Sequence, residues 1–485
     1  MPTLGERLKQ LVMHGLVFGL TSSLQSAFSF ILLPLYTKYF SLEDFGGYNM
    51  LLVIAGVCNT IFYLGASSVL GRFYYDYKEK DQDKDIVSAA FWLSMLGATL
   101  LIILSLFLAN LVCSNYLYNP SLTIPFILCM VGNALTYPIT TLTLLLRYKK
   151  KSLLYLIVTL TGLILNFSIT ISVLTLSNIK VCAPFIGMTC GNVILLIVLT
   201  YFSRKDITIQ VPRSAYRTEI IFGSQIVLTS LLNYLYGSLD KFVIKEVLSV
   251  SDVGIYSLGY RIGSLYQILI YLPFALVWAP LRMEYRKSTD NALFIKKITS
   301  YYTLGSAAFI IICMVWGNDL LSVLFPQQEY MVSLQIYPII MLGYLFYGWA
   351  DIFNFGIYVS NKFYYQSIVP IAGAVLNCGL NFILLPVFGV AISAYIFMIT
   401  FIVAALLLLI ISNKYYKLTM EWGRLGFTVF LCLLIFVLLN IIDIQLVHNI
   451  LGKIILTIVA FSTIWIFMID KNEKSHVVAY LKSVR

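Results

Sequence analysis

Residues 41–48 read SLEDFGGY, and residues 249–256 read SVSDVGIY. Ser, Asp, Gly and Tyr stand at the same four places in both stretches, at one offset of 208 residues. Ser and Asp favour the start of a helix because their side chains accept hydrogen bonds from the free N–H groups of its first turn. Two copies of this phrase, nearly half a chain apart, indicate an internal repeat.

The composition places this repeat in a membrane. Of 485 residues, 60% are hydrophobic and only 11% are charged, whereas a soluble protein has about 25% charged residues. A chain with so few charges cannot cover a water-facing surface. Apolar segments of about 20 residues span a bilayer. Fourteen such segments are predicted, near 11–36, 46–70, 87–111, 122–146, 153–174, 181–202, 220–242, 254–280, 298–316, 331–359, 365–385, 388–411, 425–442 and 450–469.

The basic residues predict how these spans are oriented. If the N-terminus is cytoplasmic, 27 of the 33 Lys and Arg residues fall in cytoplasmic segments, five fall outside, and Arg261 lies within a span. An excess of Lys and Arg on the cytoplasmic side is the usual orientation signal of membrane proteins. Both termini are therefore predicted to be cytoplasmic. The same bias accounts for the net charge of +11, so no nucleic acid is expected as a partner.

The repeat predicts how the spans are grouped. In this topology the repeated phrase precedes the second and the eighth span, so its offset equals six spans. Parallel repeats of this kind form two pseudo-symmetric lobes. The fold class is therefore predicted to be an all-α polytopic membrane protein with about 14 transmembrane helices. Its parts would be a six-helix lobe in 1–210, a second in 211–412, and two further helices with a cytoplasmic tail in 413–485.

Polar side chains inside the spans predict a cavity between the lobes. Such side chains are costly in hydrocarbon and tend to face a protein interior or a wet cavity. In the span at 331–359 five of them follow one another at spacings of 3, 4, 3 and 4 residues, on one helix face. Each could also serve only to join two helices. The predicted cavity residues are Gln25, Asn233, Arg261, Gln267, Tyr344, Tyr347, Asn354, Asn377 and Asn381.

Charged residues within the spans suggest ion coupling and phosphate binding. Asp351 lies about 15 Å from the cytoplasmic end of its span, where a lone carboxylate would bind a proton or Na⁺. The alternative is a structural ion pair, with Arg261 as the cation. Arg261 could instead reach the interface, or offer its planar guanidinium to a phosphate. Asp240 is the second candidate for ion coupling, and the alternative is a self-compensating pair with Lys241.

Four stretches resemble a known family. They are LPLYTKYFSLEDFGGYNM (33–50), LGASSVLGRFYYDYKE (64–79), SLDKFVIKEVLSVSDVGIYSLGYRIG (238–263) and LNFILLPVFGVAISAY (380–395). They are similar to Wzx-type O-antigen and capsule transporters of the multidrug/oligosaccharidyl-lipid/polysaccharide exporter superfamily. The resemblance implies a MATE-like, V-shaped fold of two lobes. The implied activity is alternating-access flipping of an undecaprenyl-diphosphate-linked oligosaccharide from the cytoplasmic to the periplasmic leaflet of a bacterial inner membrane.

The expected partners follow from this resemblance. They are the lipid-linked oligosaccharide, a coupling H⁺ or Na⁺, membrane lipid, and other polysaccharide-assembly proteins. The alternative function is a multidrug or organic-cation antiporter of the same fold, in which Asp351 and its neighbouring tyrosines would bind the cation. An enzyme is not expected, because no outside loop is long enough to house an active site. No cofactor is expected, since the chain has no nucleotide-binding loop motif and its three histidines are far apart.

Overall fold

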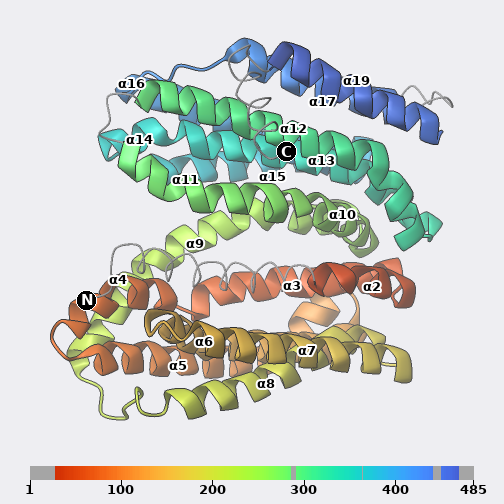
Figure 1. Ribbon diagram of the computed structural model, residues 1–485. Coiled ribbons are helices and arrows are strands. Elements are labelled where there is room, and N and C mark those ends of the chain that lie inside the picture. Colours follow the sequence, from red (N-terminus) through yellow and green to blue (C-terminus); the bar gives the residue numbers. More distant parts are fainter. Residues whose placement is uncertain (1–27, 286–290, 363, 441–448, 469–485) are drawn as a thin grey trace, which may run out of the picture. The chain divides into compact units, whose positions relative to one another are not determined.

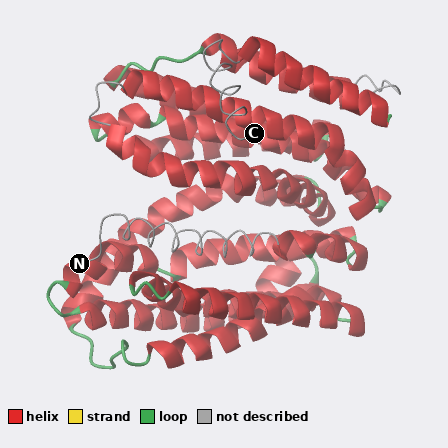
Figure 2. Ribbon diagram, viewed as in Figure 1, coloured by secondary structure: helices red, strands yellow, loops and turns green. Residues whose placement is uncertain are grey.

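The structure is a computed structural model that describes residues 28–285, 291–362, 364–440 and 449–468. These residues form helices and connecting loops without a strand (Figure 2). Twelve of their helices are long and apolar enough to cross a membrane, and Ile450–Ile466 is a shorter apolar helix. In chain order these correspond to spans two to fourteen of the sequence prediction. The first predicted span lies mostly outside the described residues.

Contacts divide the chain into two compact units, residues 1–254 and 255–485. The lobe boundaries at 210 and 412 come from the repeat and not from contacts, so they stay a prediction. The helices of the first unit are α2 (Leu33–Tyr39), α3 (Leu42–Phe62), α4 (Ala66–Lys78), α5 (Asp83–Asn110), η1 (Leu111–Tyr116), η2 (Pro120–Leu122), α6 (Thr123–Tyr148), α7 (Ser152–Leu176), η3 (Lys180–Cys182), α8 (Ala183–Ser203) and α9 (Arg213–Val247).

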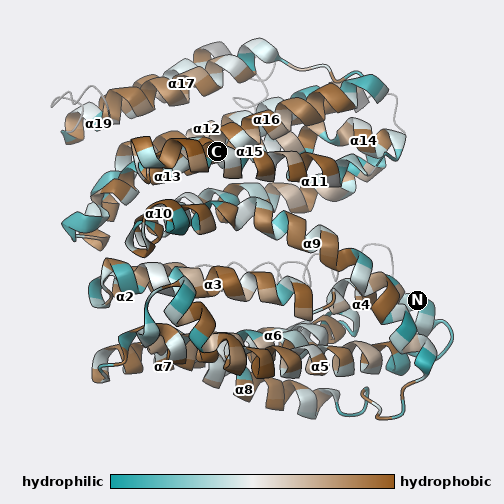
Figure 3. Ribbon diagram, turned by 180° about the vertical axis from the view of Figure 1, so that it is seen from behind, coloured by the Kyte–Doolittle hydropathy of each residue, from teal (hydrophilic) through white to brown (hydrophobic). Residues whose placement is uncertain are grey.

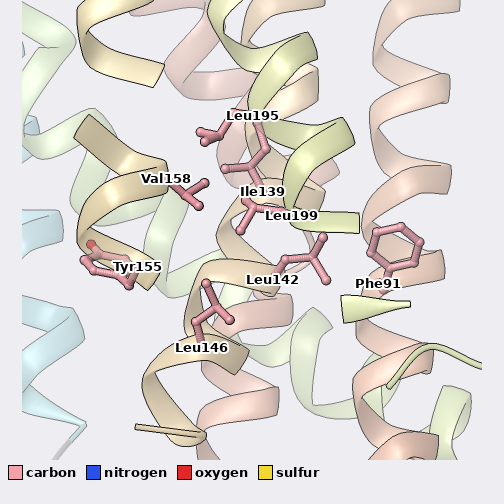
Figure 4. Packing of buried hydrophobic residues seen from close by; sticks show 8 residues of the cluster. All are labelled: Phe91, Ile139, Leu142, Leu146, Tyr155, Val158, Leu195 and Leu199. Atoms are coloured by element: carbon pink, nitrogen blue, oxygen red, sulfur yellow. The ribbon is translucent and has the colours of Figure 1, made fainter. Parts of the chain in front are cut away.

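The first unit has an apolar core between helices that lie side by side (Figure 1). Helix α6 packs against both α5 and α8, and α7 packs against α8. Their facing side chains form one buried cluster (Figure 4), which consists of Phe91, Ile139, Leu142, Leu146, Tyr155, Val158, Leu195 and Leu199. Because lipid tails are as apolar as these side chains, close packing rather than exclusion of water holds such helices together.

Helix α13 is the central element of the second unit. Nearly all of its side chains are buried, and it packs against α16 and α12. The helices of this unit are α10 (Val250–Gly263, which begins in the first unit), η4 (Gln267–Tyr271), α11 (Leu272–Tyr285), α12 (Asn291–Leu324), η5 (Gln328–Tyr330), α13 (Met331–Phe353), α14 (Phe355–Ser360), α15 (Tyr365–Phe388), α16 (Ile392–Tyr415), α17 (Trp422–Asn440) and α19 (Ile450–Met468).

The outer surfaces of the helices are apolar. Hydrophobic residues run along the lengths of the helices, and hydrophilic residues gather towards their ends (Figure 3). Large apolar side chains point outward without a protein partner, as Phe107 does with 78% of its surface exposed and Leu176 with 86%. Such exposure suits contact with lipid and not with water. The chain is a multi-pass membrane protein, as its composition predicted.

Both copies of the repeated phrase cap a helix in the same way. The Ser41 hydroxyl accepts a hydrogen bond from the Asp44 N–H at 3.1 Å, and the Ser249 hydroxyl accepts one from the Asp252 N–H at 3.1 Å. Each hydroxyl thereby satisfies an N–H group that has no partner within its helix. The predicted capping role of these serines is confirmed.

The glycines of the two phrases allow a close backbone approach within residues 1–254. A Cβ on Gly46 would lie 1.8 Å from the carbonyl oxygen of Val250, and a Cβ on Gly254 would lie 2.7 Å from that of Leu42. No side chain fits at either distance. The backbones around Gly46 and Gly254 therefore contact each other directly. Helix capping alone would not require this contact.

Candidate functional site

Two spans of the second unit, 250–285 and 328–360, which flank α12 in the sequence, meet along a polar column. Its first layer is the hydrogen bond between the Tyr260 and Tyr344 hydroxyls, at 2.8 Å. Its second layer is the edge-to-face contact of the Tyr271 and Tyr347 rings, whose centroids lie 4.8 Å apart. The polar face of α13 predicted from its spacing thus contacts the span that precedes α12.

An ion pair forms the third layer of this column. The Arg282 guanidinium donates a hydrogen bond to Asp351 Oδ1 at 2.9 Å, and the Tyr271 hydroxyl lies 3.4 Å from Oδ2. The guanidinium carbon lies 3.7 Å from the ring centroid of Tyr358, within the range of a cation–π contact. The two charged side chains are 10% and 23% exposed. A carboxylate in this position is therefore neutralised by a cation that also stacks on an aromatic ring.

Local sequence explains why these side chains share one face. Arg282 on α11 follows Tyr271 on η4 by eleven residues, and Tyr358 on α14 follows Asp351 on α13 by seven. Both intervals are close to whole helical turns, so each pair stays on one side of its span despite the change of helix. The π-helical segment η4 ends just before Pro273. A proline has no N–H group and its ring clashes with the carbonyl four residues back. The wider π turn accommodates this defect, as π segments at functional sites often do.

The cation beside Asp351 is Arg282, not Arg261. The apolar run ends near residue 280, which predicted Arg282 in the cytoplasmic loop that follows. The structure instead continues α11 to Tyr285, so Arg282 is a residue of its last turn. The spacing from Tyr271 was the signal that would have assigned Arg282 to the polar face.

The other predicted cavity residues of this region lie on the two spans that carry the column. Arg261 is half-buried on α10, and its backbone carbonyl accepts a hydrogen bond from the Ser264 hydroxyl. Gln267 is the first residue of η4 and is half-buried. Asn354 lies at the junction of α13 and α14, and its buried Oδ1 has no hydrogen-bond partner. Gln25 lies outside the described residues.

Asn377 and Asn381 join two helices. Asn381 Nδ2 donates to the backbone carbonyl of Asn377 at 2.8 Å, and Asn381 Oδ1 accepts from the Ser393 hydroxyl at 2.6 Å. Asn377 Nδ2 lies 3.5 Å from the Thr400 hydroxyl. Both asparagines are buried, and these bonds connect α15 to α16. The arrangement is that of polar side chains that hold membrane helices together.

The candidates on α9 belong to the first unit. Asn233 is exposed, and its side chain donates to the carbonyl of Thr229 at 3.0 Å. Asp240 is buried; its Oδ1 accepts from the Lys241 N–H at 2.8 Å and lies 3.6 Å from the Lys241 ammonium. The adjacent pair considered from the sequence is therefore present. Across the described ranges, no group of three or more His, Cys, Asp or Glu side chains is placed to hold a metal ion.

The comparison of the sequence with protein families decides the identity of this molecule. Residues 12–285, more than half of the chain, match the family described as Polysaccharide biosynthesis protein. The chain belongs to this family. It is a multi-pass membrane protein of a polysaccharide-biosynthesis family. No curated protein sequence matches the chain.

Solved membrane transporters share this fold. The chain is similar to the lipid II flippase MurJ in an inward closed conformation, with a TM-score of 0.71, 15% identity, and 93% of this chain and 98% of that one covered. It is similar to a MOP superfamily transporter from Pyrococcus furiosus (TM-score 0.62, 14% identity, 84% and 95% covered) and to MATE in complex with MaD3S (0.60, 16%, 84% and 95%). The predicted fold class is confirmed.

Proposed function

We propose that this transporter flips an undecaprenyl-diphosphate-linked oligosaccharide from the cytoplasmic to the periplasmic leaflet of a bacterial inner membrane, by alternating access. A charged diphosphate carrying sugars cannot cross hydrocarbon unaided, because burying an isolated charge costs many kcal/mol. The transporter must therefore offer a cation to the diphosphate and hydrogen-bonding side chains to the sugars. Family membership in polysaccharide biosynthesis supports a glycan as the cargo.

The Arg282–Asp351 pair is the observation that carries this proposal. A guanidinium binds carboxylates and phosphates through the same pair of parallel hydrogen bonds. In this structure Arg282 is engaged by Asp351. A substrate diphosphate would take the place of the carboxylate on Arg282. Asp351 would then lose its cation and bind the coupling proton or Na⁺, which links cargo binding to ion binding.

Other side chains of the proposed site would recognise the remainder of the cargo. Arg261 supplies a second cation for the diphosphate. In the same unit, the predicted residues Gln267, Tyr344, Tyr347 and Asn354 would supply hydrogen-bonding and stacking partners for sugars. Arg261→Ala should then abolish export, and Arg261→Lys should restore only part of it, because a point charge cannot reproduce the planar fork. A well-expressed Arg261→Ala variant with a normal amount of surface glycan would contradict this role.

The antiporter alternative is not favoured by the charges around Asp351. It required an uncompensated carboxylate beside aromatic rings, to bind an organic cation. The carboxylate here already has Arg282 as its partner, with one further ring, Tyr358, stacked on that cation. A drug cation would have to displace an arginine held by both interactions. We therefore expect deletion of the gene to leave resistance to organic cations unchanged.

The test is deletion of the gene followed by analysis of lipid-linked glycans. In the deletion strain these glycans should accumulate in the cytoplasmic leaflet, out of reach of a membrane-impermeant glycosidase added to spheroplasts. The wild-type gene should restore access, and Arg282→Ala should not. Arg72→Ala is the matched control, since Arg72 is exposed and forms its ion pair with the exposed Asp76 one turn away on its own helix. Glycans that reach the outer leaflet normally without the gene would overturn the proposal.

A further inference from the structure

Glu219 is a buried carboxyl group without a counter-ion. It lies on α9 and is 2% exposed. Its neighbours one turn away on the same face, Ala215 and Gly223, are buried as well, so this is the packed face of the helix. Glu219 Oε1 has no hydrogen-bond partner. None of the ion pairs among the described residues includes Glu219.

The interface around Glu219 is closely packed. One residue before it, the Thr218 hydroxyl lies 3.2 Å from the Tyr77 hydroxyl of α4. Three residues after it, the ring of Phe222 lies 4.6 Å from that of Phe73, also on α4. A Cβ on Gly223 would lie 2.2 Å from the carbonyl oxygen of Leu64. Contacts on both sides of Glu219 therefore close this part of α9 against α4.

The membrane span opposite Glu219 is interrupted. Residues 42–78 form one span, but its helix breaks at residues 63–65, between α3 and α4. Leu64 and Gly65 have φ angles of 53° and 63°, in the left-handed region that favours glycine. Non-helical backbone at membrane depth occurs where it is buried in protein or lines a wet space. The span at residues 42–78 can bend at such a break, and the packing of α4 against α9 can change when it does.

Polar groups near the break also lack good hydrogen bonds. The rings of Tyr63, which follows α3, and of Tyr137, on α6, lie 5.5 Å apart. Neither buried hydroxyl makes a hydrogen bond of good geometry with the described residues. Together with Glu219 Oε1 these are three unsatisfied polar atoms in one part of the first unit, and a packed interior normally contains few.

We propose that Glu219 is a proton-binding site that is neutral while α4 and α9 are packed together and releases its proton to water when they separate. An isolated carboxylate in a closed apolar interface would cost far more than the neutral acid. A proton is the ligand, because no cationic side chain or metal-binding cluster of the described residues supplies the missing charge. The site lies in a different unit from Asp351 and does not depend on the proposed function.

The charged and titratable groups of the packed elements do not supply a counter-charge. On α4, Arg72 is exposed and pairs with Asp76, and Lys78 is exposed at the helix end. On α5, the first turn carries the acids Asp83 and Asp85, and Lys84 between them is exposed to solvent. The phenol of Tyr63, which follows α3, carries no positive charge, and the Tyr77 hydroxyl of α4 lies 3.2 Å from the Thr218 hydroxyl. On α9 itself the nearest basic residue, Arg217, is exposed.

Infrared spectroscopy of the reconstituted full chain tests the protonation directly. At neutral pH the wild type should show the C=O stretching band of a protonated carboxyl, with an isotope shift in heavy water. Glu219→Gln should remove this band, because glutamine keeps the shape of the neutral acid without its carboxyl. Asp76→Asn is the control and should leave the band in place, since Asp76 is an exposed carboxylate paired with Arg72. A wild-type band that survives in Glu219→Gln would overturn the proposal.

Hydrogen exchange tests the coupling of the proton to opening. Residues 213–224 should exchange faster in the wild type than in Glu219→Gln as the pH is raised. The ratio of the two rates should increase by up to about tenfold per pH unit once the proton is lost on opening. A ratio that does not change with pH would overturn the coupling. If Glu219→Gln is poorly expressed, Glu219→Leu serves in both measurements, because a neutral site without partners tolerates an apolar side chain of similar size.

Discussion

Asp351 accepts a hydrogen bond from Arg282 across 69 residues of sequence. Both charges are mostly withdrawn from solvent, so each depends on the other. Removing one partner of a buried pair leaves an uncompensated charge, whereas removing both often costs little. This asymmetry distinguishes a structural pair from a coupling site. In both cases, removing both charges should restore stability. For a coupling site, however, transport should stay lost.

The first prediction therefore concerns three variants of this pair. Asp351→Asn and Arg282→Gln should each lower the free energy of unfolding by about 3–5 kcal/mol. The double variant should recover most of that loss, as measured by thermal unfolding of the purified protein. Surface glycan should be absent in all three, because phosphate binding and ion coupling are lost.

Two outcomes would contradict this view of the pair. Normal export by a well-expressed Asp351→Asn variant would show that ion coupling does not run through this residue. Export restored by the double variant would show that the pair only supports the fold. The Arg72→Ala variant again serves as a control for loss of an arginine as such, since Arg72 is 68% exposed.

At the scale of elements, the glycine of the repeated phrase controls how closely two chain segments approach. The Cβ of an alanine at position 46 would lie 1.8 Å from a carbonyl oxygen. Backbone, unlike a side chain, cannot rotate away, so one of the segments must move. Overpacking of this kind typically costs 1–3 kcal/mol or more.

We predict that Gly46→Ala lowers the unfolding temperature and the yield of folded protein. Gly237→Ala is the matched control, because Gly237 is also helical and no atom lies within 4 Å of its added Cβ. That control should be neutral or slightly stabilising, since alanine favours a helix more than glycine does. Equal stability of the two variants in thermal unfolding would show that the phrases do not need their close contact.

A second element-scale prediction concerns the attachment of α17 to α12. Glu421 accepts a hydrogen bond from the Ser300 hydroxyl at 2.7 Å and pairs with Lys296 at 3.3 Å and Arg424 at 2.8 Å. Burial would raise the pKa of Glu421, but the Ser300 hydrogen bond and the neighbouring cations outweigh it. The pKa of this carboxyl is therefore below its ordinary value of 4.5.

The sign of the pH effect follows from this lowered pKa. A carboxyl with a depressed folded pKa adds stability above its unfolded pKa and loses it as the pH falls through the folded value. The wild type should therefore lose unfolding temperature below about pH 4.5 more steeply than Glu421→Gln does. Parallel curves for the two proteins in acid would contradict a stabilising role for the Glu421 charge.

At the scale of the whole molecule, the orientation in the membrane rests on the distribution of basic residues. We predict that Asn115→Cys and Gln328→Cys react with an impermeant thiol reagent from outside, and that Lys80→Cys and Lys150→Cys react only after permeabilisation. All four positions are exposed in the structure. The wild type, with its eight free cysteines, gives the background. Reversed accessibility would invert the topology and place both termini outside. Gln445, a further outside position in this topology, lies outside the described residues.

The sequence by itself determined the membrane class, the described spans in their order, the two helix caps and the polar face of α13. Each of these depends on residues close in sequence, through helical periodicity, apolar length or capping, so spacing alone reveals them. The family and the fold were also predicted, from four stretches of sequence that resemble known transporters.

Only the tertiary structure decided which distant groups meet. It gave Asp351 the cation Arg282, because α11 extends beyond the apolar run that marked its end. It engaged Asn381 in bonds between helices, and it enclosed Glu219 against a broken span. Spacing assigns a residue to a face of its helix, but the packing of other helices decides what that face contacts. The environment of a buried charge is set by those contacts, so it cannot be read from the segment that carries it.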